Sequence, residues 1–308
     1  MLRVALRFLS FPLVFFGALV GCWWGMESGH PAALVVFGIS VGAALLVTLL
    51  ERVLPHAPRW SQGHDDVPTD LFYAISSLFA APRLFDVLAL SAIVQFVSTT
   101  PLGHSVWPTH LPWGLQLVAA VVLAEFGSYW WHRLMHEQPT LFRLHATHHS
   151  SPRLYWLNAT RFHPLDNVFM YALHILPLTL LGASESVLVG FTVWSLVHGF
   201  FQHANIDVRL GPLNYFFSMS ELHRWHHSRD VREANRNYGS NCILWDLVFG
   251  TFFWPRHRQP PVDVGLSGLP DFPQTVLPQL LSPFCWPTGR LGKLSLAEGA
   301  ADDTSESH

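Results

Sequence analysis

The sequence predicts an all-α integral membrane protein with about four transmembrane helices and a membrane-inserted helical hairpin. Three observations support this fold class. Half of the 308 residues are hydrophobic and only 13% are charged, whereas soluble domains carry about 25% charged residues. Uncharged runs that are long enough to cross a bilayer recur along the chain. Arginine residues collect on one side of these runs, as they do in the cytoplasmic loops of membrane proteins.

Two uncharged segments near the N-terminus predict the first two membrane spans. Residues 8–26 contain no charged side chain, and neither do residues 32–50. At 1.5 Å per residue, each segment can cross a hydrocarbon core of about 30 Å. The sequence Leu19–Cys22 resembles a lipoprotein cleavage site. Cleavage there would export the arginine-rich remainder, so we interpret the segment as an uncleaved helix and a secretory signal as the alternative.

Further apolar regions complete the predicted membrane part. Residues 71–98 form a third span that a Pro-Arg pair interrupts, and residues 114–131 form a fourth span that ends in aromatic side chains. Two shorter apolar stretches, 167–181 and 186–201, predict a helical hairpin. Its depth in the membrane stays open at this point, and a buried hairpin of a soluble protein is the alternative.

The arginine distribution predicts the orientation of the chain. Arginines flank the first two spans on one side and follow the fourth span, whereas the segments 27–31 and 99–113 contain none. The arginines in question are Arg3, Arg7, Arg52, Arg59, Arg133, Arg143, Arg153 and Arg161. Because arginine and lysine mark cytoplasmic loops, we expect both termini and every histidine motif in the cytoplasm, at a bacterial inner membrane.

The composition suggests three regions. We expect N-terminal transmembrane helices in residues 1–119, the chemistry-bearing region in residues 120–254, and a proline-rich, partly disordered tail in residues 255–308. The net charge of −3 provides no basic surface for nucleic acid. The three cysteines are far apart and fit neither a disulfide framework nor a CxxC metal site.

Histidine is the outlier of the composition, with nineteen copies that cluster in short motifs. Residues three and four apart on a helix share a face, about 5–6 Å apart at Cβ, so two imidazoles of one motif can bind one metal ion. The second ring of an adjacent pair points about 100° away, toward a neighbouring ion or a neighbouring helix. Nine clustered imidazoles exceed the needs of one metal, and we predict a two-metal site. The motifs are His132-Arg-Leu-Met-His136, His145-Ala-Thr-His148-His149 and His223-Arg-Trp-His226-His227, with His203 before the last.

The residues alone leave the identity of the metal open, because imidazole binds iron, zinc and copper. The HExxH and HxxEH motifs of zinc proteases are absent. The sequence contains one ExxH motif, Glu27–His30, which lies away from the other motifs. A soluble di-iron carboxylate bundle needs two such motifs, so the sequence excludes that class. A site with many nitrogen ligands beside a membrane suits oxidation of an unactivated C–H bond by iron and dioxygen. A membrane zinc hydrolase is the first alternative, and a metal transporter is the second.

The segments HRLMH, HATHHS, RFHPLD, FQHAN and ELHRWHHS, followed by NYGSNCILWDLVFGTFF, resemble the fatty acid hydroxylase/sterol desaturase superfamily over about residues 120–254. The resemblance implies a membrane protein with two iron ions, dioxygen as oxidant, and hydroxylation or desaturation of a sterol-like, fatty acyl or ether lipid. It also implies an external electron donor, either a protein or a reduced pterin, because the chain has no CxxCH or GxGxxG motif. It carries metal ligation onto His132, His136, His145, His148, His149, His203, His223, His226 and His227.

Four further residues are expected to support the ligands. Glu125 lies two helical turns before His132 on the same face, where it would accept an N–H from that ring or from a neighbour of it. An ion pair with an interfacial arginine is the alternative. His163, in RFHPLD, is expected to orient a loop or donate a hydrogen bond near the metals. Asn205 and Asn237 are expected to hold a metal-bound water or to cap helices.

Two other side chains lie near the motifs in sequence. His198 lies five residues before His203 on a different helical face, and is the weaker ligand candidate. Asp246 is expected to form an ion pair with an arginine such as Arg224, which is a structural role.

Overall fold

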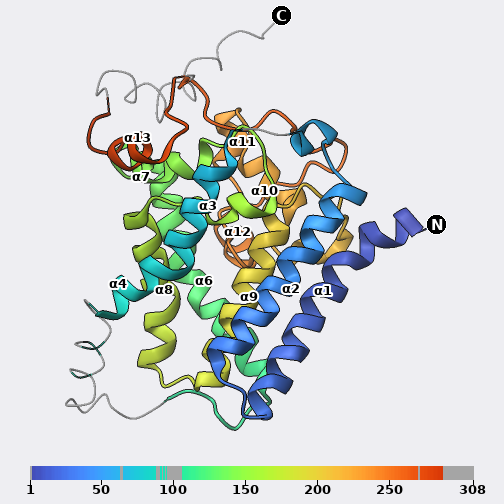
Figure 1. Ribbon diagram of the computed structural model, residues 1–308, viewed down its shortest axis with the longest axis vertical. Coiled ribbons are helices and arrows are strands. Elements are labelled where there is room, and N and C mark those ends of the chain that lie inside the picture. Colours follow the sequence, from blue (N-terminus) through green and yellow to red (C-terminus); the bar gives the residue numbers. More distant parts are fainter. Residues whose placement is uncertain are drawn as a thin grey trace, which may run out of the picture.

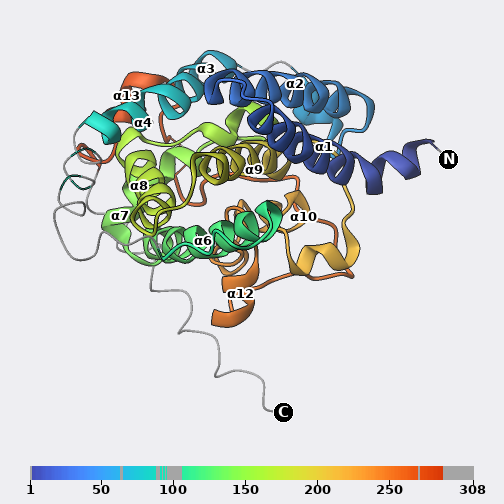
Figure 2. The same ribbon diagram turned by 90° about the horizontal axis from the view of Figure 1, so that it is seen from below.

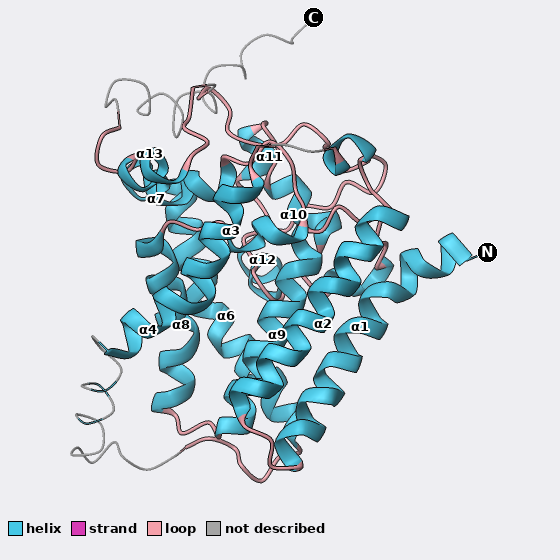
Figure 3. Ribbon diagram, in the orientation of Figure 1, coloured by secondary structure: helices cyan, strands magenta, loops and turns pink. Residues whose placement is uncertain are grey.

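The computed structural model describes residues 2–62, 65–87, 91, 93, 95, 106–269 and 271–286. Within these ranges the chain is helical, and β pairing is confined to isolated bridges (Figure 3). The all-α prediction is confirmed. The longer helices are α1 (Leu2–Glu27), α2 (Ala32–Val53), α3 (Val67–Ile75), α6 (Trp113–Glu137), α7 (Pro139–His149), α8 (Pro164–Leu180) and α9 (Glu185–His203). The shorter ones are η1 (Pro58–Ser61), η2 (Ser76–Ala80), α4 (Ala81–Phe85), η4 (Trp156–Thr160), η5 (Gly211–Tyr215), α10 (Ser220–His226), α11 (Val231–Ala234), α12 (Leu244–Phe249) and α13 (Val276–Leu281).

Helices α1 and α2 form an antiparallel pair at one edge of the molecule (Figures 1 and 2). They contain the predicted spans 8–26 and 32–50, and in the described chain they alone are long and apolar enough to cross a membrane. Only 22% and 17% of their most apolar windows are buried. Side chains such as Phe16, Leu45 and Leu49 therefore point away from the protein. These outward apolar faces suit contact with lipid and associate the chain with a membrane.

The other predicted membrane segments are helical where the structure describes them. The segment 71–98 begins in α3 and continues through η2 and α4, and most of it beyond residue 87 lies outside the described residues. The segment 114–131 lies within α6. The predicted hairpin is α8 and α9, which are separated by a turn with Gly182 at φ +83°. That backbone conformation favours glycine and ends α8.

Helix α9 is the central element of the fold (Figure 2). It packs against α1 and α2 on one side and against α6 on the other. The contact with α1 is built from aromatic rings: Phe11 lies 5.4 Å from Phe201 and 5.1 Å from Phe217, measured between ring centroids. These side chains are almost completely buried. The membrane pair and the histidine-bearing helices therefore share one core.

Buried polar contacts attach the N-terminal helices to the end of the molecule that carries the histidines. Glu51, at the end of α2, accepts hydrogen bonds from the backbone N–H groups of Trp156 at 2.8 Å and Asn205 at 2.9 Å. On the side of α3, Asp66 accepts two hydrogen bonds from the guanidinium of Arg153, at 2.8 and 2.7 Å. A planar guanidinium matches a carboxylate in this bidentate arrangement. These contacts fix the segment that follows α7.

The first part of the predicted tail packs on the histidine-bearing end. Phe272 and Trp286 form a small apolar cluster with Ala146 of α7, and Gln279 of α13 donates a hydrogen bond to Ser150 Oγ at 3.1 Å. Residues 287–308, which include the segment expected to be disordered, lie outside the described residues. The division into regions at residues 119 and 254 stays a prediction.

The contact between α6 and α9 generates a stability prediction. A Cβ atom added at Gly190 would lie 2.5 Å from the ring of Trp113, so Gly190→Ala should push the two helices apart. Overpacking of this kind lowers the free energy of unfolding by about 1–3 kcal/mol. Thermal unfolding in detergent measures the effect, with Gly114→Ala as the control because a Cβ there meets no atom within 4 Å. Equal midpoints for the two variants would contradict this packing.

Candidate metal centre

Nine buried histidines meet where the ends of α6, α7, α9 and α10 come together. They form two groups, and within each group the ring nitrogens offered as ligands all lie within 4.8 Å of one another. All nine histidines of the sequence motifs are thus brought together. The five-histidine group consists of His132, His136, His145, His149 and His226, and the four-histidine group consists of His148, His203, His223 and His227.

Each HxxHH motif contributes to both groups. In the motif of α7, His145 and His149 lie one helical turn apart and join the five-histidine group, whereas His148 joins the four-histidine group. In the motif at the end of α10 the assignment is reversed: the outer two histidines join the four-histidine group and the middle one joins the five-histidine group. Adjacent residues on a helix point about 100° apart. The spacing of the motif therefore divides its rings between two centres.

Most rings of the five-histidine group are held from outside through Nδ1. Four Nδ1 atoms lie 2.7–3.1 Å from an oxygen atom of another residue. Since a carbonyl or carboxylate oxygen accepts the hydrogen bond, Nδ1 carries the proton and Nε2 carries the free lone pair. The pairs are His132 with the Tyr238 carbonyl, His136 with the Asn235 side-chain oxygen, His145 with the Asp166 carboxylate, and His226 with the Arg236 carbonyl.

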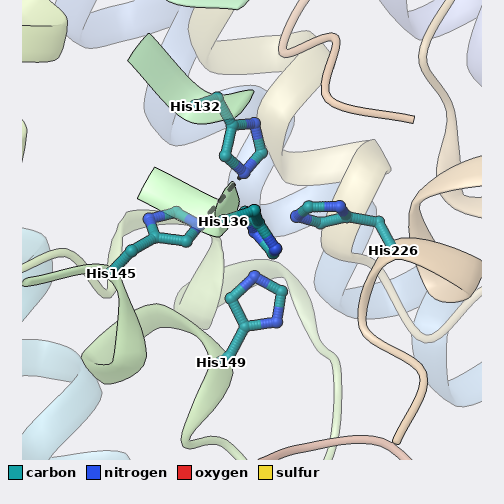
Figure 4. A group of neighbouring side chains, drawn as sticks. All are labelled: His132, His136, His145, His149 and His226. Atoms are coloured by element: carbon teal, nitrogen blue, oxygen red, sulfur yellow. Dashed lines mark hydrogen bonds between the residues drawn. The ribbon is translucent and has the colours of Figure 1, made fainter. Parts of the chain in front are cut away.

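The Nε2 atoms of the five-histidine group face a common centre (Figure 4). Nε2 of His132 lies 3.0 Å from Nε2 of His145, although both atoms are acceptors. The Nε2 atoms of the other three rings are buried and have no hydrogen-bond partner among the described residues. An unsatisfied buried polar atom costs about 1–3 kcal/mol. A cation at the centre would satisfy all five lone pairs together, so the donor set fits a metal ion.

In the four-histidine group, two rings are also held through Nδ1 by an oxygen atom outside the group. Nδ1 of His203 lies 3.0 Å from the side-chain oxygen of Asn158, and Nδ1 of His148 lies 3.3 Å from the carbonyl oxygen of Arg161. On the inner side, Nε2 of His223 lies 2.9 Å from Nε2 of His203. These contacts again turn ring nitrogens inward and supply a second set of ligands for a metal ion.

The two groups are direct neighbours. The rings of His149 and His227, one from each group, stack at a centroid distance of 4.4 Å. The rings of His145 and His148 lie 5.0 Å apart. Two ions held by these groups would occupy one continuous centre.

Six histidines of the two groups, which lie on α7 and on or directly after α10, favour the neutral form. Burial lowers the pKa of each of these imidazoles well below its usual value, and neighbouring imidazoles lower the pKa further. A neutral ring offers the lone pair that a metal needs, whereas a protonated ring does not. The nitrogen-only donor set suits iron, zinc or copper. The rings concerned are His145, His148, His149, His223, His226 and His227.

The prediction that Glu125 contacts His132 is wrong. Glu125 is completely buried, but its two carboxylate oxygens accept the backbone N–H groups of Ser240 and Asn241. His132 instead donates to the carbonyl oxygen of Tyr238 at 2.7 Å. The segment 238–241 lies between the acid and the ring, so Glu125 acts on His132 through the backbone.

Two buried carboxylates hold this segment. Asp246 accepts the N–H groups of Tyr238 and Gly239, each at 2.8 Å, and Glu125 accepts the next two. Asp246 therefore has no need of the expected partner Arg224, whose guanidinium donates to backbone carbonyls at 2.8 and 2.7 Å instead. A Cβ atom at Gly239 would collide with the carbonyl oxygen of Cys242, so glycine is required there by close approach.

The other supporting residues expected from the sequence have structural roles. His163 caps α8 by accepting the N–H of Leu165, and its Nε2 lies 3.2 Å from a carbonyl oxygen of α13. Asn205 binds the backbone N–H and carbonyl of Ala57. Asn237 accepts and donates backbone hydrogen bonds with Phe253. Within the described part of the chain, the hydrogen bonds of these three residues go to groups other than the nine histidines. His198 also lies apart, among the rings of the α1 contact.

Sequence reasoning missed three side chains that form hydrogen bonds with the rings: Asp166, Asn158 and Asn235. Asp166 lies in the first turn of α8, where an acid is favoured by the helix dipole alone. An acid in this position is therefore expected without any contact to His145. The motif RFHPLD was the available signal, because Asp166 follows His163 by three residues within it.

A cavity of about 200 Å³ leads from the histidines between α8 and α9. Five histidines of the two groups line this cavity: His132, His145, His148, His203 and His223. Apolar side chains of α8 and α9 line much of the remainder, including Met170, Leu196 and Phe200. A smaller pocket of about 70 Å³ reaches His136 and His149 from the side of α11. The largely apolar lining of the larger cavity suits an apolar ligand.

Comparison with known proteins agrees with this centre. Residues 117–251 match the family described as Fatty acid hydroxylase. Ornithine lipid hydroxylase OlsE of Rhizobium tropici is 34% identical over 289 residues, which cover 92% of this chain and 85% of the relative. Alkylglycerol monooxygenase of Homo sapiens is 32% identical over 188 residues, 61% of this chain and 41% of the relative. Methylsterol monooxygenase 1 of Rattus norvegicus is 26% identical over 136 residues, 44% of this chain and 45% of the relative. No solved structure matches the chain.

The chain therefore belongs to the fatty acid hydroxylase family and is a lipid hydroxylase of that family. The resemblance seen in the histidine motifs is confirmed. The two histidine groups form a site for metal ions of the kind that this donor set binds.

The contact between Asp166 and His145 generates a metal-binding prediction. Asp166→Asn removes one of two acceptor oxygens, which serve His145 at 3.0 Å and Trp131 at 3.0 Å. Loss of an orienting partner typically weakens metal affinity by about 10–100-fold. Metal content after dialysis against graded chelator measures the change. Asp263→Asn, at an exposed ion pair with Arg59, is the control, and chelator resistance equal to the control would refute the orienting role.

The backbone contacts of Glu125 generate a different prediction. Glu125→Gln leaves one of two buried N–H groups without an acceptor, so the metal-free protein should lose about 1–3 kcal/mol of stability. A residue that oriented only a ligand ring would leave metal-free stability unchanged. Thermal unfolding of chelator-treated protein distinguishes the two roles. Glu137→Gln, on the same helix but in an exposed ion pair with Arg133, should unfold like the parent.

Proposed function

We propose that the protein is a membrane-bound, non-haem di-iron oxidoreductase that uses dioxygen to hydroxylate a lipid. The observation that carries the proposal is the set of neutral imidazoles whose lone pairs face two adjacent centres. The five ring nitrogens of the larger group exceed the four ligands of a tetrahedral zinc site. This excess argues against a zinc hydrolase. The position of both groups at one end of the helices, away from their middle, argues against a metal transporter.

The proposed substrate is an acylated amino-acid lipid. Support comes from the relative with the most extensive match reported above, which is named an ornithine lipid hydroxylase and matches 92% of this chain. The other relatives are named monooxygenases, which favours hydroxylation over desaturation. In such a reaction one atom of dioxygen enters a C–H bond and the other leaves as water. The two electrons and two protons required come from an external donor, either a protein or a reduced pterin.

The histidines and the cavity of this chain would have different roles in the reaction. Iron bound to the two groups supplies the redox chemistry that activates dioxygen. The nine histidines hold the metals, and their Nδ1 contacts fix the ring orientations. The cavity between α8 and α9 aligns the lipid with the centre, and its apolar walls keep water away from the reacting carbon.

We also propose four membrane crossings, with the histidine groups and both termini on the cytoplasmic side of a bacterial inner membrane. The crossings are α1, α2, the segment 71–98 and α6, while α8 and α9 form the inserted hairpin. Support comes from the arginine distribution. The position of α9 between the apolar pair and α6 agrees with this arrangement (Figure 2).

Lipid analysis of a host that expresses the protein tests the proposed function. The parent should convert an ornithine lipid to a product heavier by one oxygen atom. His148→Ala and His226→Ala, one from each group, should abolish conversion and still insert into the membrane. His257→Ala, at an exposed position, should remain active. Wild-type turnover in either site variant would remove that histidine from the metal shell, and an unchanged lipid profile with the parent would refute the substrate assignment.

Cysteine labelling tests the proposed topology. In a Cys285→Ser background, Ser28→Cys and Gln62→Cys place single exposed thiols in the segments that follow α1 and η1. A membrane-impermeant maleimide should label position 28 in intact spheroplasts and position 62 only after lysis, because the two positions flank α2. Labelling of position 62 in intact cells would overturn the cytoplasmic placement of the histidines.

A further inference from the structure

Two buried polar atoms lie on the wall of the large cavity without a hydrogen-bond partner from the described residues. Nε2 of His174 on α8 and Oγ of Ser195 on α9 are both buried, and neither has a hydrogen-bond partner among the described residues. Both residues line the cavity. Other polar side chains on its wall are satisfied by the protein: Asn167 donates to Ser77, and Gln202 donates to Ser218.

The two atoms belong to one place in the cavity. The ring of His174 lies 5.4 Å from the ring of Phe191 across the hairpin, measured between centroids. Ser195 follows Phe191 by four residues on α9, and residues four apart occupy one helical face about 5–6 Å apart. His174 and Ser195 therefore face the same section of the cavity from opposite helices.

This section is separated from the metal centre by a defined length of α9. Ser195 precedes His203 of the four-histidine group by eight residues, which corresponds to about 12 Å along a helix. The wall between them is apolar at Leu196 and Phe200. A chain that occupies the cavity would thus contact polar groups at its far end and the metal centre at the other.

We propose that His174 and Ser195 bind an acyl carbonyl oxygen of the lipid and thereby determine which carbon reaches the metal centre. The inference rests on the proposed function, because it assumes that an acylated lipid occupies the cavity. A carbonyl oxygen has two lone pairs and can accept both the N–H of His174 and the O–H of Ser195. A polar histidine within a membrane-inserted hairpin also requires a partner, and the apolar parts of a lipid provide none.

Lipid binding to purified, metal-free protein in detergent tests the proposal without turnover. The probes are a synthetic diacyl ornithine lipid, an analogue with the ester replaced by an ether, and an analogue with the amide replaced by an amine. The parent should bind the diacyl lipid about tenfold more tightly than the analogue that lacks the recognised carbonyl. Whichever analogue shows the loss identifies the carbonyl as the ester or the amide.

The variants decide between recognition and packing. His174→Phe and Ser195→Ala should each weaken binding of the diacyl lipid. Both variants should leave unchanged the binding of the analogue that lacks the recognised carbonyl. His174→Gln, which keeps an N–H donor, should retain part of the preference. Thr179→Val, which removes a hydroxyl bonded within α8, should behave as the parent. Equal losses for all probes, or a full preference in His174→Phe, would overturn the proposal. Failure to oxidise lipid in cells would refute the proposed function and leave this binding result standing.

Discussion

Imidazole lone pairs that face one another inside a protein repel unless a cation lies between them, and this constraint organises the histidine-bearing end of the molecule. Nε2 of His132 and Nε2 of His145 approach to 3.0 Å while both donate through Nδ1 to fixed oxygens. The rings are therefore held in a geometry that favours a bound metal over the metal-free state. A metal ion that binds these rings in the folded protein, and not in the unfolded chain, also stabilises the fold.

The oxygens that fix the rings come from segments far apart in the chain, and this explains why so much of the fold serves the site. Asp166 enters from α8, Asn158 from η4, and the Tyr238 carbonyl from the segment before α12. The segment 238–241 is held by Glu125 and Asp246, which accept its four successive N–H groups. Helices α1 and α2 complete the support, since α9 carries His203 and packs against both.

Much of this arrangement could be predicted from the sequence, because helical periodicity is a local property. The spacing of the HxxHH motifs predicted both the shared face and the division between two centres, and the uncharged runs predicted α1, α2, α6 and the α8–α9 hairpin. The orienting contacts could not be predicted. Several acceptors are backbone carbonyls, as at Tyr238 and Arg236, which carry no residue signature. The sequence indicates Glu125 as a supporting residue but predicts a contact with His132, because it does not show that the segment 238–241 lies between the two side chains. Neither nearness in sequence nor motif resemblance shows a contact: Asn205 and Asn237 bind backbone groups, and His163, which the RFHPLD motif indicated, caps α8.

Anomalous diffraction at the iron edge, from crystals of protein purified without added metal, tests the central claim most directly. The account predicts two peaks, one enclosed by the five-histidine group and one by the four-histidine group. A single peak, a zinc signal in place of iron, or iron bound away from these nine histidines would contradict it.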